Sequence, residues 1–427
     1  MRALVLGAAV SGRAALRLLE EEGHDVVVYD ADPQAVAGLA AGRRVHGGEW
    51  DRSLLSGIDL VVASPGVPPH APPLADSLGA GIPVWGELEF AARHLSVPLL
   101  AVTATNGKTT ITRMADAMLA ASGRRSAAVG NIGVPLSEAV GGDWDVLVVE
   151  ASSFQLRFTE SFHPSVAVLL NVAPDHLDWH GSFPAYLAAK ARIHRNQGPE
   201  DLLVFDGEDA GAREAVATAA ARLGPVSGSH RPPGGSGPAD GRLWLGEEAV
   251  SLEGVASVDP IFLVDAAAAG TAARALGATV AGIEEALRSF RSPDHRRRVV
   301  GTWGGVTWVD DSKATNPHAV VAALRSYRSV VLIAGGRNKG LDVASVAVEP
   351  NLRHVIGIGE AGPEMAGAAR AGTVVGGLEE AVALADELAR PGDTVLLAPG
   401  CASFDMFRSY AHRGEVFAAA VRRRKEG

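Results

Sequence analysis

The chain has 427 residues, of which 47% are hydrophobic and 21% are charged, values that are typical of globular proteins and exclude a disordered chain. At roughly 100 to 200 residues per domain, this length predicts more than one domain. The formal net charge of -10 makes nucleic acid an unexpected partner, because the overall field repels polyanions.

The one cysteine, Cys401, cannot form an internal disulfide, which favours a reducing compartment. The start of the chain, Met1 to Val10, imitates a short signal peptide, but Arg13 ends the apolar stretch early, and we favour a strand, a glycine turn and a helix. No apolar run approaches the roughly 18 residues of a membrane span. We therefore expect a cytoplasmic monomer that acts on small molecules.

Short β-branched runs alternate with Ala- and Leu-rich helical stretches along the chain, the pattern of βαβ units and mostly parallel sheets. In chain order the predicted strands are Ala3–Leu6, Val26–Tyr29, Leu60–Ala63, Leu99–Thr103, Val146–Glu150, Val166–Asn171, Val330–Ala334 and Val395–Ala398. The predicted fold class is therefore α/β.

Two polar seams, at Arg93–Pro98 and Ser292–His295, predict three domains, with bounds 1–93, 94–292 and 293–427. The second seam follows an amphipathic helix that ends near Phe290. Residues 224–241, rich in Gly, Pro and Ser, are predicted to form a surface loop inside the middle domain.

The first motif, Gly7-Ala-Ala-Val-Ser-Gly12, follows a strand and precedes Asp30 at the distance expected of a ribose-binding acid. Ala9 replaces the glycine that lets a pyrophosphate approach the backbone, which favours a uridine-type nucleotide, or no ligand, over a dinucleotide. A plain strand-to-helix turn remains open. Ser64-Pro65-Gly66 ends another strand of this domain and can line one cleft with Ser11 and Asp30.

The second motif, Thr103-Ala-Thr-Asn-Gly-Lys-Thr-Thr110, lies between a hydrophobic strand and a helix predicted over Ile111–Ala121. Backbone N–H groups at a helix start hold anionic oxygens, and a lysine reaches the outer phosphates. Val102 stands where the standard phosphate-loop pattern has glycine, so the pattern is matched only in part. We still expect phosphate binding, rather than an exposed Asn-Gly turn.

A third set of polar residues follows strands of the middle domain: Glu150, then His176 between Asp175 and Asp178, then Lys190. The carboxyl ends of parallel strands face the crevice where ligands bind. Mg²⁺ prefers oxygen ligands and keeps waters and substrate phosphates. Glu150 and His176 are therefore candidate metal or base groups, although a lone histidine is more often structural.

The fourth set follows strands of the C-terminal region, in the stretches Asp310–Pro317, Gly335–Lys339 and Pro399–Phe407. Lys313 and Lys339 can meet a carboxylate or a phosphate as point charges. No histidine pairs with Cys401 in its own loop, so we expect a buried structural cysteine rather than a nucleophile.

Together these motifs resemble the muramoyl-peptide (Mur) ligases of peptidoglycan synthesis. The resemblance rests on Thr-x-Thr-Asn-Gly-Lys-Thr-Thr, Glu-x-Ser-Ser-Phe-Gln-Leu, Leu-Asn-Val-x-x-Asp-His-Leu-Asp, Asp-Ser-Lys-Ala-Thr-Asn and Cys-Ala-Ser-x-Asp-x-Phe, in that order along nearly the whole chain. The third and last motifs favour the branch that joins D-glutamate to UDP-N-acetylmuramoyl-L-alanine. The Asp-Asn-Pro-Arg box of the diaminopimelate- or lysine-adding branch is missing.

The resemblance implies a Rossmann-like N-terminal domain, a P-loop-type central sheet that is mostly parallel, and a Rossmann-like C-terminal domain. It also implies ATP-dependent amide formation through an acyl phosphate, with D-glutamate and UDP-N-acetylmuramoyl-L-alanine as substrates. Two Mg²⁺ ions are expected, and Lys190 is expected to be carbamylated, which turns an amine into an oxygen ligand.

The match assigns each candidate residue a role. Lys108, Glu150, His176 and Lys190 are the catalytic group. ATP is expected on Ala104, Thr105, Asn106, Gly107, Lys108, Thr109 and Thr110, with Asp265, Arg296 and Asp311; the metals on Thr109, Glu150, His176 and Lys190; UDP on Ser11, Asp30, Ser64, Pro65 and Gly66; the muramoyl-alanine part on Asn131 and Ser152; and the glutamate on Lys313, Thr315, Lys339, Ser403 and Tyr410.

The chain departs from the family pattern at several positions. Ala9 and Ala104 replace glycines near phosphates, Tyr410 replaces phenylalanine, and Ile261, Phe262 and Asp265 stand where a His-Asn pair and a second Asn lie near adenine. Three alternatives therefore stay open: a folate- or polyglutamate-type ligase, which would lack this N-terminal domain; a non-catalytic nucleotide-binding regulator; and a dehydrogenase.

Overall fold

A computed structural model describes residues 1–40, 42–291 and 294–426. They form two compact units, one of Met1–Val172 with Pro184–Phe290, and one of Ala173–Phe183 with the chain from Arg291 onward. The predicted seam at Ser292 and Pro293 lies outside the described residues. Within the described parts of the chain, none of the helices is both long and apolar enough to cross a membrane.

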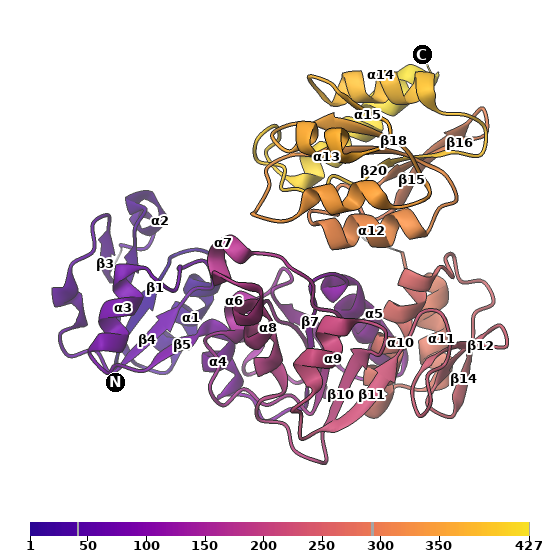
Figure 1. The fold of residues 1–427 in the computed structure, drawn as a ribbon. Helices are drawn as coiled ribbons and strands as arrows, with labels where there is room; N and C mark the ends of the chain where they lie inside the picture. The colour runs from indigo at the N-terminus through magenta and orange to yellow at the C-terminus, as the bar shows by residue number, and fades with distance from the viewer. Residues whose placement is uncertain (41, 292–293, 427) are drawn as a thin grey trace. The chain divides into compact units, whose positions relative to one another are not determined.

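The first unit begins with a parallel sheet of order β3-β2-β1-β4-β5 (Figure 1). Alternate residues of the central strand enter two separate cores, with Ala3 and Val5 on one face and Leu4 and Leu6 on the other. A sheet covered on both faces therefore forms, as the continuous apolar strands predict. The elements are β1 (Arg2–Leu6), α1 (Val10–Glu21), β2 (Asp25–Asp30), α2 (Pro33–Ala37), β3 (Arg44–Gly47), η1 (Arg52–Leu55), β4 (Leu60–Ala63), α3 (Pro72–Gly79), β5 (Val84–Gly86) and α4 (Glu87–Ala92).

A second, six-stranded parallel sheet of order β11-β10-β9-β6-β8-β7 follows. Its main core packs β6 against three helices, α5, α10 and α11. The elements are β6 (Leu99–Thr103), α5 (Lys108–Ala121), β7 (Ser126–Gly130), η2 (Leu136–Ala139), β8 (Val146–Glu150), α6 (Ser153–Leu156), β9 (Val166–Leu169), α8 (Phe183–Ala191), η3 (Arg192–His194), β10 (Leu202–Asp206), α9 (Ala210–Val216), β11 (Arg222–Val226), α10 (Pro260–Ala275) and α11 (Val280–Ser289).

The stretch 224–241, predicted to be a loop, contributes strand residues at both ends. β11 pairs with β10, and β12 (Gly237–Ala239) opens a small antiparallel sheet with β13 (Arg242–Leu245) and β14 (Glu248–Ser251). Pro225 fits into β11 because this strand is the last in its sheet, where a missing N–H is tolerated. The prediction holds for residues 227–235 and was wrong at both ends, because edge strands accept the Gly and Pro that otherwise indicate loops.

Helix α4 joins the first sheet to the second through two buried carboxylates. The Glu89 carboxylate accepts backbone N–H bonds from Glu160, Ser161 and Phe162, each at 2.9 Å. Glu87 Oε1 accepts both the N–H and the hydroxyl of Ser137 at 2.7 Å. These bonds fix the first sheet against the second.

The second unit contains a sheet of order β15-β16-β20-β17-β18-β19, parallel except for β15. Successive residues of β17 alternate between two cores, so helices cover both faces. The elements are α7 (Leu177–His180), β15 (Arg298–Trp303), β16 (Val306–Asp310), α12 (Pro317–Arg325), β17 (Val330–Gly335), η4 (Val343–Val348), β18 (Leu352–Ile358), α13 (Gly362–Ala368), β19 (Gly372–Val374), α14 (Leu378–Leu388), β20 (Thr394–Leu397) and α15 (Tyr410–Glu426). The predicted α/β class is confirmed.

Candidate active site

The predicted phosphate loop lies where β6 ends and α5 begins. Gly107 caps the helix with φ = 97°, a left-handed conformation that suits glycine. Asn171, just after β9, holds the loop by three bonds: its carbonyl accepts from Thr105 N, its Oδ1 from Asn106 N, and its Nδ2 donates to Asn106 O. The start of α5 is thus presented as an anion-binding site.

Two lysines meet at one carbonyl oxygen of this loop. Lys108 Nζ and Lys190 Nζ each donate to Ala104 O at 2.7 Å, the second from α8. The Lys190 side chain is 1% exposed and lies 4.8 Å from the centre of the Tyr186 ring. Tyr186 in turn bonds Thr105 through its hydroxyl, at 3.1 Å. The pair of ammonium groups makes this end of the sheet suitable for phosphate oxygens.

Glu150, at the end of the neighbouring strand β8, is buried with an incompletely satisfied carboxylate. Asn131 Nδ2 donates to its Oε1 at 3.2 Å, whereas Oε2 is buried and has no hydrogen-bond partner in the described chain. A buried carboxylate oxygen without a partner is unfavourable, and a bound cation would satisfy it.

A ready-made metal centre is not built into the described residues, where no three His, Cys, Asp or Glu side chains gather. Mg²⁺ does not require one, because it commonly takes one or two protein oxygens and completes its shell with water and substrate phosphates. Thr109, in the first turn of α5, and Glu150 fit that role.

Asp265 lies beside the phosphate loop, on α10. It is 5% exposed, and its Oδ1 would be 2.7 Å from a Cβ added at Gly107. Any side chain at Gly107 would therefore collide with this carboxylate. Phe262, one turn earlier on α10, is buried and packs against Phe290.

Asp30 stabilises the glycine-containing loop that follows β1. Its Oδ2 accepts from Ala8 N at 2.7 Å and its Oδ1 from Asp32 N at 2.9 Å. Ser64 Oγ donates to Gly7 O at 3.3 Å, and Pro65 and Gly66 follow it, while Ser11 lies in the first turn of α1. The predicted UDP residues are thus brought together around one loop.

Ser152 has a local structural role. It caps α6, accepting from Gln155 N at 3.2 Å while Gln155 Oε1 accepts from its N–H at 3.0 Å. This capping box fixes the chain directly after Glu150.

In the second unit, two buried acids lie at the carboxyl end of β16, Asp310 as its last residue and Asp311 directly after it. Asp310 Oδ2 lies 2.7 Å from His295 Nδ1, and Asp311 Oδ1 accepts from Arg297 N. Burial raises the pKa of Asp311 to about 6, although Arg297 and Arg296 oppose the shift. The Arg296 Nε is also buried, with no hydrogen-bond partner among the described residues. Both groups are suited to a polar ligand.

Arg413, which the sequence did not single out, connects the loops after β16 and β20. Its side chain is 1% exposed. Nε donates to Ser312 Oγ at 2.9 Å, and Nη2 donates both to Ser312 O at 2.8 Å and to Cys401 O at 3.2 Å. Burial lowers its pKa to about 10 and raises the pKa of the Cys401 thiol to about 12. The expectation of a buried, unreactive cysteine is consistent with this position.

The predicted glutamate residues lie in loops of the second unit. Lys313 Nζ lies 5.0 Å from the centre of the Tyr410 ring, and Ser403 is buried in the loop after β20. Lys339 Nζ and Asn316 Nδ2 both bond the carboxylate of Asp175, at 2.5 and 3.0 Å. Thr315 precedes Asn316, and His176 follows Asp175 with φ = 52°.

Three family models match the chain: "Mur ligase MurD-like, N-terminal domain" over residues 1–86, "Mur ligase middle domain" over 102–226, and "Mur ligase, glutamate ligase domain" over 295–401. Proteins named UDP-N-acetylmuramoylalanine–D-glutamate ligase are similar over nearly full length. That of Frankia casuarinae is 46% identical, covering 99% of this chain and 94% of the relative. That of Thermobifida fusca is 40% identical, covering 99% and 98%.

Solved structures share the fold at low identity. A pseudomurein peptide ligase type C from Methanothermus fervidus aligns with a TM-score of 0.60 at 18% identity, covering 93% of this chain and 96% of that one. MurF from Acinetobacter baumannii aligns with a TM-score of 0.59 at 18% identity, covering 78% of each chain.

Proposed function

The chain belongs to the Mur ligase family, and on this premise we propose that it joins D-glutamate to UDP-N-acetylmuramoyl-L-alanine with conversion of ATP to ADP and phosphate. The relatives that carry this activity in their names match it over almost their whole length. We also propose that the functional divisions are 1–93, 94–292 and 293–427.

The proposed reaction has two steps. An oxygen of the alanyl carboxylate attacks the γ-phosphorus of ATP, the bond to the β–γ bridging oxygen breaks, and ADP leaves. The amine of glutamate then attacks the acyl carbon, a C–N bond forms, the amine loses a proton, and phosphate leaves. Activation is needed because a carboxylate is a poor electrophile until one oxygen becomes a leaving group, and phosphoryl transfer depends on alignment and charge neutralisation.

In the first unit, the loop from Ala104 to Thr110 binds the phosphates. Its backbone N–H groups and Lys108 neutralise the oxygens on which charge develops. Asp265 lies against this loop and we assign it to the nucleotide. Asn131 and Ser152 hold the muramoyl-alanine part, and Ser11, Asp30 and Ser64–Gly66 hold UDP.

In the second unit, we assign Arg296 and Asp311 to ATP. Lys313 and Lys339 hold the carboxylates of the incoming glutamate, with Thr315, Ser403 and Tyr410 around it. Arg413 positions two of these loops and is not assigned to a ligand. His176 belongs to the metal and base group.

We propose two Mg²⁺ ions, with Thr109, Glu150 and a carbamylated Lys190 of the first unit as ligands, and the family resemblance adds His176, which belongs to the second unit. When bound, Mg²⁺ neutralises phosphate charge. The unpartnered Glu150 Oε2 supports this assignment, because that oxygen needs a cation. Carbamylation of Lys190 would replace an ammonium with a second anionic oxygen donor.

The observation that carries the proposal is the meeting of Lys108 and Lys190 on Ala104 O, with the incompletely satisfied Glu150 at the end of β8, the strand paired with β6. A folate-type ligase is disfavoured because the N-terminal family model matches residues 1–86. A dehydrogenase is disfavoured because the relatives are ligases.

The test is phosphate release from ATP with UDP-N-acetylmuramoyl-L-alanine and one amine at a time: D-glutamate, L-glutamate, lysine or diaminopimelate. We expect release that depends on D-glutamate. Release with another amine would change the substrate assignment, and no release with any amine would favour the non-catalytic alternative.

A further inference from the structure

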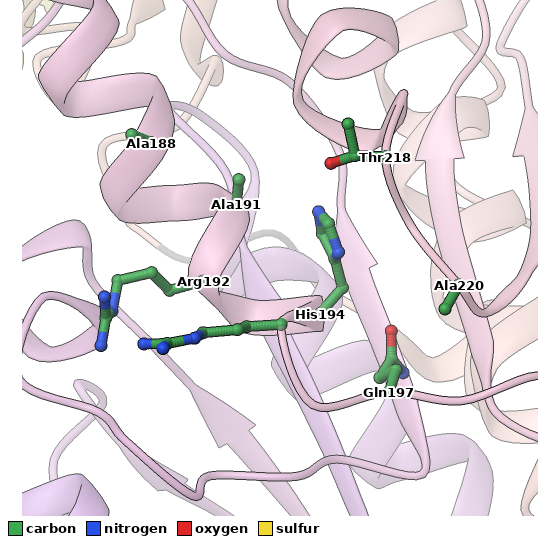
Figure 2. A pocket seen from close by; sticks show the side chains of 8 residues that line it. Ala188, Ala191, Arg192, His194, Gln197, Thr218 and Ala220 are labelled. Carbon is green, nitrogen blue, oxygen red and sulfur yellow. The ribbon is translucent and has the colours of Figure 1, made fainter.

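A hollow of about 360 Å³ lies in the first unit, between the end of α8 with η3 and the segment after α9 (Figure 2). The polar side chains that line it do not converge, because Arg192 points away from Gln197 in Figure 2. The amide nitrogen of Gln197 already donates to Pro164 O and Leu202 O, at 3.0 and 3.2 Å. We assign this hollow no ligand. The second unit holds a more closely built group of polar side chains.

Three loops of the second unit, those after β16, β17 and β20, carry the residues expected around glutamate. In the sheet β20 lies between β16 and β17, and its loop bonds the loop on each side. Gly400 N donates to Ala314 O at 2.8 Å, and Ala402 and Arg337 exchange two backbone hydrogen bonds, each at 3.0 Å. The two outer loops are joined to each other by a side chain from another part of the chain.

Asp175 supplies this connection. It belongs to residues 173–183, which are part of the second unit although the chain on either side belongs to the first. Its Oδ2 accepts from Asn316 Nδ2 in the loop after β16, at 3.0 Å. Its Oδ1 accepts from Lys339 Nζ in the loop after β17, at 2.5 Å. The side chains of Asp175 and Lys339 are 7% and 15% exposed, so this ion pair is largely shielded from water.

The ammonium group of Lys339 keeps donors for a ligand. It has three N–H groups, and in the described parts of the chain its one hydrogen bond is the bond to Asp175. The backbone of its loop is fixed by Asn338, whose Oδ1 accepts from Leu341 N at 2.8 Å and whose Nδ2 donates to Leu341 O at 2.9 Å. Both the backbone and the side chain are therefore held in place, with two N–H groups left over.

A fixed ammonium group favours binding because the four-carbon side chain of lysine is otherwise flexible. Ordering that side chain during binding costs conformational entropy, whereas a side chain already in place receives a carboxylate without this cost. A largely buried ammonium group without a counter-charge is also unfavourable, so Lys339 would leave this position if Asp175 were neutral.

We propose that Asp175 is a positioning residue for the amino-acid substrate, which holds Lys339 where its ammonium group receives a carboxylate of glutamate. The inference rests on the proposed function, which assigns glutamate to Lys339. Asp175 acts through Lys339 and does not itself bind the substrate. Its second bond, to Asn316, fixes the neighbouring Thr315 of the same site relative to Lys339.

The test is the steady-state rate of phosphate release by the full chain, with one substrate varied at a time. Asp175→Asn keeps the shape of the side chain and removes its charge, so the KM for D-glutamate should rise about tenfold because Lys339 is no longer held. The KM values for ATP and for UDP-N-acetylmuramoyl-L-alanine should change by less than about twofold, because neither ligand depends on Lys339.

Asp393→Asn is the matched control, because it also removes the charge of a buried, paired acid of the second unit. Asp393 is 6% exposed and forms an ion pair with Arg353. It precedes the amino end of β20, whereas the glutamate loops follow the carboxyl ends of these parallel strands. This variant should lower the melting temperature and leave the KM for D-glutamate unchanged.

A Lys339→Ala background shows whether Asp175 acts through this lysine. Lys339→Ala alone should raise the KM for D-glutamate, and adding Asp175→Asn should raise it by less than about twofold more, because the group that Asp175 positions is already absent. A further rise of about tenfold in the double variant would show that Asp175 acts by another route, and would refute the proposal.

Asp175→Glu provides a second variant in case Asp175→Asn does not fold. Its carboxylate keeps the charge but is displaced by one methylene, so the KM for D-glutamate should rise about threefold. An unchanged KM for D-glutamate in the folded variants would overturn the proposal. So would a fall in kcat alone, which would assign Asp175 to the neighbouring His176. Failure of the proposed function is distinct, because the wild-type chain would then release no phosphate with D-glutamate.

Discussion

Lys108 and Lys190 donate to the same carbonyl oxygen, that of Ala104, but they belong to different helices. Lys108 belongs to the first turn of α5 and bonds both Ala104 O and Thr105 O. Lys190 comes from α8 and is nearly inaccessible to solvent. A buried amine at the phosphate loop can serve the reaction either as a cation or, after carbamylation, as an oxygen donor.

Replacement of Lys190 distinguishes these two roles. Lys190→Ala should lower the rate of phosphate release by roughly 100-fold or more, and short carboxylates such as formate or acetate should restore part of it by supplying an oxygen ligand in the space left behind. The measurement is steady-state phosphate release with and without the added acid.

Lys108→Ala is the matched control, because it removes a lysine from the same carbonyl. Its loss should not respond to carboxylates, since a cation is missing there. A Lys190→Ala variant that keeps its activity, or that gains nothing from any short acid, would exclude the carbamate.

Three residues show the limit of sequence reasoning at this scale. Asp265 lies against Gly107 of the phosphate loop, and its assignment to ATP stays a prediction. Arg413 and Gln197 were missed because a single Arg or Gln in a helix or turn reads as an exposed residue. Only the packed structure shows that both are buried. Burial is a tertiary property that one sequence does not display.

Helix α4 shows how a short element can fix two sheets together. Glu89 is fully buried, and its carboxylate receives the backbone N–H groups of three successive residues in addition to Arg93 Nε. Burial alone would disfavour the ionised form, but the hydrogen bonds from Ser161, Glu160 and Arg93 outweigh it and lower the pKa of Glu89.

Glu89→Gln should destabilise the first unit by about 2–4 kcal/mol at pH 7, because the amide NH₂ would face backbone donors. The lowered pKa means that Glu89 stabilises the fold above the pKa of an unfolded glutamate, and that this contribution disappears as pH falls through the folded value. The difference between wild type and Glu89→Gln, measured by urea unfolding, should therefore shrink below about pH 4.

Glu87→Gln provides a control of opposite sign. Burial raises the pKa of Glu87, although the bonds from Ser137 oppose the shift, so its contribution is present at low pH and is lost as pH rises through the folded value. The cost of this substitution at pH 7 should be within about 1 kcal/mol. A Glu89→Gln penalty that stays constant with pH would contradict the role given to the carboxylate.

Element prediction succeeded where strands are continuous and buried. The predicted strand Leu99–Thr103 is β6 residue for residue, and Val166–Asn171 extends only two residues beyond β9. It failed at β11 and β12, where pairing at a sheet edge overcomes the low strand preference of Gly and Pro. The bonds from Glu87 and Glu89 of α4 to the second sheet's domain were not predicted, because glutamates in a helix usually indicate an exposed surface.

On the scale of the whole molecule, the chain is divided between two units with separate cores. It passes from one to the other only after Val172, after Phe183 and after Phe290. Each unit has its own sheet or sheets and its own hydrophobic cores, so each can unfold with its own cooperativity.

Thermal unfolding in the absence of substrates should therefore depart from a single two-state transition. In scanning calorimetry the calorimetric enthalpy should exceed the van't Hoff enthalpy, because the latter reports the size of one cooperative unit. A ratio of one at several scan rates would show that the two units unfold together.

The order of strands in the sheet of the second unit has a consequence for how the nascent chain acquires its shape. β20 lies between β16 and β17, although it follows them in sequence. Until residue 397 has been synthesised, the inner edges of β16 and β17 have no partner, and unpaired edges invite association with other chains. The first unit needs only residues up to 290 and can fold earlier. Translational pausing between residues 335 and 394 would therefore expose this protein to aggregation more than pausing at any point within its first sheet.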